Sequence, residues 1–228
     1  MQRLLDRHRF NDVDRALRFL ALRLGSRPES ASLTEDVTQA RAEVRETEER
    51  YQDALMARVA ATAEIRYLDG LLDEAVMDLS RQALVLTGGR RDDARYMKLF
   101  VSSPSDGMRS IAGDSQDQFV RNILLRLRED VDFEPLRPHA ETLATRQAAL
   151  QASVEKRRAL SVPEAAADAD RRIALENARR LYNRAEAQLR LRFDDEGLVE
   201  SYFARLYAGR SEGEESVSEE EEGSVVDG

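Results

Sequence analysis

Residues 32–87 read SLTEDVTQARAEVRETEERYQDALMARVAATAEIRYLDGLLDEAVMDLSRQALVLT, and this stretch decides the fold class. Its apolar residues recur at intervals of three and four, the period of a helix that buries one face. This stripe consists of Leu33, Val37, Ala40, Val44, Ile65, Leu68, Leu72, Ala75 and Leu79. Two glycines at 88 and 89 follow and are typical of a helix end. The stretch therefore predicts one long helix, on the order of 80 Å at about 1.5 Å per residue.

The same stretch also indicates where the helix starts and that a second helix packs against it. Ser32 and Glu35 have the spacing of a capping box. In this motif the serine side chain accepts the backbone N–H of the glutamate, and the glutamate side chain accepts the backbone N–H of the serine. The middle is rich in alanine, at positions 54, 57, 60, 61 and 63. Small side chains let a second helix approach closely, and the heptad-like stripe predicts coiled-coil-like packing.

Helical periodicity continues through most of the remaining chain. It predicts further helices over 2–24, 92–101, 115–131 and 197–208, and a long helical stretch from a turn at 132–135 to about 193. Pro163 interrupts that stretch, and Ser161 with Glu164 again fits a capping box. The stretch is therefore either one kinked helix or two helices joined at a tight corner. We find no alternating strand pattern, so the predicted fold class is all-α.

The two halves of the chain resemble each other. Val13 and Leu20 match Val120 and Leu127 at an offset of 107, and the paired acids 92–93 and 194–195 each follow a long helix. We interpret those acids as N-caps of short helices rather than as metal ligands. The pattern predicts an elongated pseudo-two-fold helical bundle. Its parts are a repeat unit at 1–102, a linker at 103–114, a second unit at 115–209 and a disordered acidic tail at 210–228.

Charge is concentrated at the C-terminal end. The net charge of the chain is −9, and residues 211–228 hold eight of its 44 acidic residues and none of its 35 basic ones. The rest of the chain is therefore almost neutral. An acidic run of this kind cannot bury apolar surface and repels itself, so it is predicted to stay unfolded. It serves either as a solubilising tail or as a competitor for a basic surface.

Composition excludes several classes of protein. The 228 residues include no cysteine, which removes disulfide scaffolds, thiolate metal sites and cysteine nucleophiles. There is no apolar run long enough for a membrane span, and the charged start does not fit a signal peptide, so we expect a cytoplasmic protein. The strong preference for arginine over lysine indicates a GC-rich, bacterial-type genome. His8 and His139, expected at the surface or a helix end, lack the spacing of a di-iron site, and no nucleotide-binding loop is present. We therefore expect no catalytic residues, no cofactor and no metal.

One segment is strongly basic. Residues 171–192 carry seven arginines against Glu176 and Glu186. The arginines are Arg171, Arg172, Arg179, Arg180, Arg184, Arg190 and Arg192. Such a run is usually a solvated helix face whose arginines pair with neighbouring acids. The alternative is a surface that binds the phosphates of a nucleic acid or another polyanion.

These observations favour a non-enzymatic helical protein that interacts with other proteins and self-associates, as a homo-oligomer. The first alternative is a nucleic-acid or polyanion binder that uses 171–192, with the acidic tail as an internal competitor. The second is a helical bundle that binds a small ligand or acts as an enzyme, and the third is a scaffold that lies on an anionic membrane.

Overall fold

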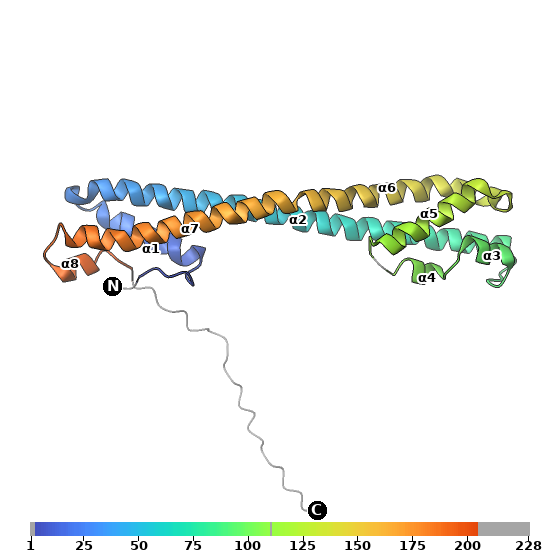
Figure 1. The fold of residues 1–228 in the computed structure, drawn as a ribbon, viewed down its shortest axis with the longest axis horizontal. Helices are drawn as coiled ribbons and strands as arrows, with labels where there is room; N and C mark the ends of the chain where they lie inside the picture. The colour runs from blue at the N-terminus through green and yellow to red at the C-terminus, as the bar shows by residue number, and fades with distance from the viewer. Residues whose placement is uncertain (1–2, 110, 205–228) are drawn as a thin grey trace, which may run out of the picture. The chain divides into compact units, whose positions relative to one another are not determined.

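The structure, a computed structural model, describes residues 3–109 and 111–204 and is helical over most of that part of the chain (Figure 1). In chain order the elements are α1 (Phe10–Leu24), η1 (Pro28–Ser30), α2 (Ala31–Leu86), α3 (Ala94–Leu99), α4 (Pro104–Gly107), α5 (Asp114–Glu129), η2 (Val131–Leu136), α6 (Arg137–Ala159), α7 (Ser161–Arg190) and α8 (Glu196–Glu200). No strand occurs among these described residues, which confirms the all-α prediction. The predicted tail at 210–228 lies outside them.

Contacts between residues divide the chain into two compact units. The first takes in the described residues of Met1–Ala42 and Leu175–Gly228, and the second is Glu43–Ala174. Helices α2 and α7 each contribute residues to both units. The first unit therefore combines two segments that are distant in sequence, whereas the second is continuous.

The first unit is built around α1. Its buried residues recur at intervals of three and four, as helical periodicity predicts, and are Val13, Ala16, Leu17, Leu20 and Leu24. The helix begins at Phe10 rather than near Gln2, because the Asp12 carboxylate accepts the Arg9 N–H and closes the first turn there. The preceding residues are held to α7 instead: the Asn183 side-chain amide accepts the Leu4 N–H and donates to the Leu4 carbonyl, both at 3.0 Å.

The long helix α2 contains 56 residues and ends where the sequence predicts. Gly88 and Gly89 have φ values of 63° and 82°, a region in which glycine is favoured, and the Gly89 N–H donates to the Leu84 carbonyl at 2.7 Å. The predicted start is wrong by a short distance. Ser32 already lies inside the helix, since the η1 turn at Pro28–Ser30 leads directly into α2, so Ser32 is not its N-cap.

The interruption near Pro163 is a break in hydrogen bonding. Only Leu160 separates α6 from α7, its backbone is helical (φ −71°, ψ −14°), and the Glu164 N–H donates to its carbonyl at 3.3 Å. Pro163 has no N–H to donate to the carbonyl four residues earlier, so the ladder is lost there without a tight corner. The predicted capping box is wrong, because the Ser161 hydroxyl donates to the Arg158 carbonyl at 2.7 Å and the Glu164 carboxylate pairs with Arg58.

The second unit has a continuous core formed by α2, α3, α5, η2 and α6. Its fully buried large side chains include Leu72, Leu79, Ile123 and Phe133. The core residues of the group are Ile65, Leu72, Ala75, Val76, Leu79, Ala83, Tyr96, Leu99, Phe100, Met108, Val120, Ile123, Leu124, Leu127, Phe133, Leu136, Ala140, Leu143 and Leu150. At one edge the Phe119 ring lies directly against Gly107, where a Cβ would be 2.5 Å from a ring carbon. Glycine is required there for space.

Substitution of Gly107 by alanine is predicted to lower the free energy of unfolding by about 1–3 kcal/mol, because the Phe119 ring must move out of its place in the core. Urea denaturation followed by circular dichroism measures the change. Gly70→Ala is the matched control: nothing lies within 4 Å of its Cβ position on α2. There alanine should raise the free energy of unfolding by about 0.5–1 kcal/mol through helix propensity. Equal effects at the two positions would contradict the packing argument.

Candidate functional site

The seven arginines of 171–192 lie on α7 and immediately after it. The first of them, Arg171, belongs to the second unit, and its side chain is 24% exposed. The Arg171 guanidinium lies over the Tyr51 ring, 4.0 Å from its centroid. It also pairs with Asp168 at 2.6 Å and with Glu48 at 3.6 Å. Arg172 shares the same Asp168 carboxylate at 2.7 Å. Arg171 therefore fixes α7 against α2 in this unit, and little of its charge remains for a ligand.

The arginines of the first unit are largely paired as well. Arg180 pairs with Glu176 at 2.8 Å and Arg190 pairs with Glu186 at 3.1 Å, each one helical turn away. A second carboxylate, Glu196, lies 2.9 Å from Arg190, and hydrogen bonds from Arg190 to these two carboxylates raise the pKa of Arg190. These are solvent-exposed pairs of the kind that contribute little to stability.

Three arginines have other surroundings. The side chain of Arg179 is 13% exposed and donates to the carbonyls of Asp6 and His8, at 3.2 and 2.5 Å, so it anchors the segment before α1. Arg192 donates to the Ser32 hydroxyl at 3.4 Å. Arg184 is exposed on α7. Arg171 and Arg172 therefore share one carboxylate, that of Asp168. Most of the seven arginines contact carboxylates or backbone carbonyls of the protein itself.

The two acid pairs supply helix caps. The Asp93 carboxylate accepts the Arg95 N–H at 2.9 Å at the start of α3, and this hydrogen bond lowers the pKa of Asp93. At the start of α8, Asp195 accepts the Leu198 N–H at 3.1 Å. The capping interpretation is therefore confirmed. His8 is buried rather than on the surface, and its Nδ1 accepts the Leu5 N–H at 2.8 Å.

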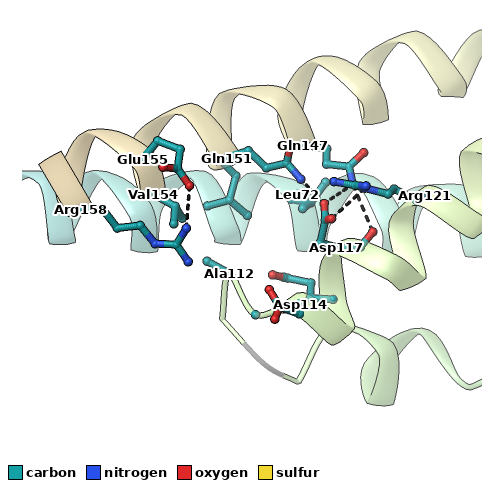
Figure 2. A pocket seen from close by; sticks show the side chains of 13 residues that line it. Leu72, Ala112, Asp114, Asp117, Arg121, Gln147, Gln151, Val154, Glu155 and Arg158 are labelled. Carbon is teal, nitrogen blue, oxygen red and sulfur yellow. Dashed lines mark hydrogen bonds and ion pairs between the residues drawn. The ribbon is translucent and has the colours of Figure 1, made fainter.

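The second unit contains a pocket of about 280 Å³ between α5, α6 and one turn of α2. Asp117 lines the pocket and lies beside Arg121 and Gln147, as Figure 2 shows. One carboxylate oxygen of Asp117 accepts from Gln147 at 2.6 Å and from Gln151, and the other pairs with Arg121 at 2.8 Å. Three donors of the protein itself therefore occupy this carboxylate, which leaves little of its capacity for a bound molecule.

A buried carboxylate lies beside this pocket and was not predicted from the sequence. Asp69 is 6% exposed, accepts the Gln116 side-chain N–H at 2.7 Å and accepts the Ala112 N–H at 3.4 Å. Ala112 has a φ of 51°, which alanine rarely adopts, so Asp69 helps to hold a strained turn. The available signal was an acidic residue four positions after Ile65, within the apolar stripe.

A second carboxylate lies one turn further along α2. The pKa of Asp73 is raised, first by burial and then by the neighbouring negative charge of Asp69. In the folded protein the protonated form of Asp73 is therefore favoured more than in the unfolded chain. Its contribution to stability is present below the ordinary carboxyl pKa and is lost as the pH rises through the raised value.

Asp73→Asn is therefore predicted to raise the free energy of unfolding at neutral pH, because it removes a charge that burial and Asp69 disfavour. The gain should shrink toward zero near pH ~3, where the native carboxyl is protonated in both states. Urea denaturation at a series of pH values measures it. Glu49→Gln, at an exposed position of α2, is the control and should change stability by less than about 0.5 kcal/mol at any pH. A gain for Asp73→Asn that is independent of pH would contradict this assignment.

The other unusual feature of the second unit is a set of exposed residues on α2, which we name the outer face. It consists of Met56, Val59, Ala60, Ala63, Tyr67, Gly70 and Met77. Met56, Val59, Tyr67 and Met77 are 57%, 52%, 67% and 42% exposed, respectively. The core residues of α2, such as Ile65 and Leu72, lie on the opposite side of the helix.

The alanine-rich middle of α2 divides between these two sides. Ala61 is buried in the described structure, whereas Ala57, Ala60 and Ala63 are exposed. The run of small residues indicates close helix approach, but it does not separate a core-facing side from a solvent-facing one. Alanine is compatible with both, so the pattern alone carries no such signal.

Comparison of the chain with family models, curated proteins and solved structures finds no match. Within residues 3–109 and 111–204, none of the helices is both long and apolar enough to cross a membrane. The same described residues include no group of three or more histidine or acidic side chains placed to hold a metal ion. Function must therefore be inferred from the surfaces described above.

Proposed function

We propose that the chain is a non-enzymatic helical interaction protein that binds another helix through the outer face of α2. The observation that carries this proposal is the exposure of Met56, Val59, Tyr67 and Met77 along one side of a helix whose opposite side forms a core. Single exposed apolar residues are ordinary on protein surfaces. A row of them at helical spacing is typical of an interaction site.

The composition of the outer face supports a helix as the partner. Ala60, Ala63 and Gly70 have small side chains or none, and nothing lies within 4 Å of the position a Cβ would take at Gly70. Small residues let two helix backbones approach to the short end of the usual range of about 8–10 Å. The larger side chains of Met56 and Tyr67 would then pack against the partner on both sides of the contact.

We also infer that the chain arose by duplication and is pseudo-two-fold, with coiled-coil-like packing of its long helices. The order of elements supports this: α1, η1, α2 and α3 correspond to α5, η2, α6 with α7, and α8. The caps support it too, since Asp93 and Asp195 occupy the same place before the two short helices. A duplicated helical unit suits an interaction protein, because each copy presents further helix faces to solvent.

Substitution of Tyr67 by glutamate is predicted to abolish association without unfolding the chain, because the residue is 67% exposed and a carboxylate cannot be buried unpaired in a helix contact. Light scattering during size-exclusion chromatography of natively purified protein measures the mass. The wild type should exceed the 25.8 kDa of one chain, and Tyr67→Glu should reduce the mass to that value.

Leu125→Glu is the matched control, since Leu125 is 52% exposed in the same unit but belongs to α5, which packs on the core side of α2. It should leave the mass of the wild type unchanged. A wild type that elutes as a single chain with no bound protein would contradict the proposed function.

The polyanion alternative has less support, because most arginines of 171–192 contact carboxylates or backbone carbonyls. We expect the natively purified protein to carry no nucleic acid. The chain has no tryptophan and six tyrosines, so even a small amount of nucleic acid would dominate the ratio of absorbance at 260 and 280 nm. An excess at 260 nm that disappears in high salt would favour the alternative instead.

A further inference from the structure

The outer face of α2 has nearly the same pattern in both directions. Met56, Ala63, Gly70 and Met77 are spaced by seven residues, so they form one line along the helix. The two methionines lie at the ends, and the two smallest residue types lie on either side of Tyr67 near the middle. Such a pattern fits a copy of itself that runs in the opposite direction. Met56 then faces Met77 of the second copy, and Ala63 faces Gly70 of the second copy.

Charge at the two ends of the outer face favours the same direction. In the antiparallel arrangement Asp53 meets Arg81 of the second copy, and this pair forms twice. In a parallel arrangement each would meet its own like charge, which is repulsive. The Arg81 side chain is 68% exposed and its present partner is Asp78, an exposed pair that is easily exchanged. Glu74, which also lies on this side, is balanced by Arg146 of its own unit at 3.6 Å.

We propose that the outer face of α2 binds the outer face of a second copy of this chain, with the two helices antiparallel and centred at Tyr67. This inference rests on the proposed function and names its partner. The arrangement is isologous, so it closes at two copies and leaves no open end for further growth. The small residues Ala63 and Gly70 leave room for both Tyr67 rings at the centre, where aromatic side chains contribute most to an interface.

Exchange of the charges at Asp53 and Arg81 tests the direction. Asp53→Arg alone and Arg81→Asp alone each make both end pairs repulsive, so each variant should dimerise on the order of tenfold more weakly than the wild type. A mixture of the two variants should form a mixed dimer of wild-type strength. At one end of that dimer the arginine introduced at position 53 meets the aspartate introduced at position 81, and at the other end the native Arg81 meets the native Asp53.

Analytical ultracentrifugation measures the dissociation constants of the wild type, of each variant and of the mixture. Single variants that dimerise as the wild type does would overturn the proposal. A mixture that is no stronger than its components would overturn it as well, because the restored pairs are then not formed.

Cysteine cross-linking tests the register in the same full-length protein, because the native sequence has no cysteine. In the antiparallel arrangement, Met56→Cys should not form a disulfide with itself, since the two copies of position 56 lie roughly 30 Å apart along the helices. A mixture of Met56→Cys and Met77→Cys chains should form one under mild oxidation. Met56→Cys that cross-links to itself would mean a parallel arrangement and would overturn the proposal.

The two proposals fail in different ways. If the wild type forms no dimer and the mixed Met56→Cys and Met77→Cys chains form no cross-link, but the wild type elutes in a complex with a different protein that Tyr67→Glu dissolves, the second-copy proposal is wrong and the proposed function stands. If the wild type elutes as a free single chain, both are wrong.

Discussion

The single helix α2 is the constraint on which the rest of the structure depends. It runs unbroken for 56 residues and supplies core residues to both units, Leu33 and Val37 to the first and Leu72 and Leu79 to the second. A helix can bury only one stripe against the elements of its own unit, so the opposite side must meet either solvent or another molecule. In the second unit that opposite side carries exposed apolar and small residues, among them Met56, Ala63, Tyr67 and Met77, beside a few charged ones. The proposed function and the proposed dimer both follow from this one property.

The sequence predicted the helices well because their signals are local. The period of apolar residues located the buried stripes of α1, α2 and α5, and the glycines at 88 and 89 marked the end of α2. The acid pairs before α3 and α8 were identified as caps for the same reason, since a cap acts within its own turn. Each of these features is decided by residues that are close neighbours in the chain.

Features that depend on distant residues were missed or misplaced. Ser161 fits a capping box, but Arg58 of α2 binds the Glu164 carboxylate that the box requires. The segment before α1, predicted as helix, is held to α7 by side chains more than 170 positions away. Asp69 was missed because its partner Gln116 is 47 positions distant. A local pattern shows that a residue is able to cap a helix or to be buried. Contacts with residues distant in the sequence decide whether it takes that role in the folded protein.

The candidate site could be predicted only in part, and the reason is the chemistry of the side chains that form it. Strong apolar residues such as Ile65 and Leu79 identify the core side of α2, because they have no other stable environment. Alanine, glycine and methionine tolerate both water and a helix contact, so their periodicity becomes informative only after the core side is known. The same tolerance is what an association surface needs: Met56, Tyr67 and Met77 remain soluble when exposed and still gain from burial. Because none of them belongs to the core of its own unit, substitutions on the outer face separate assembly from folding, which substitutions in a buried stripe cannot do.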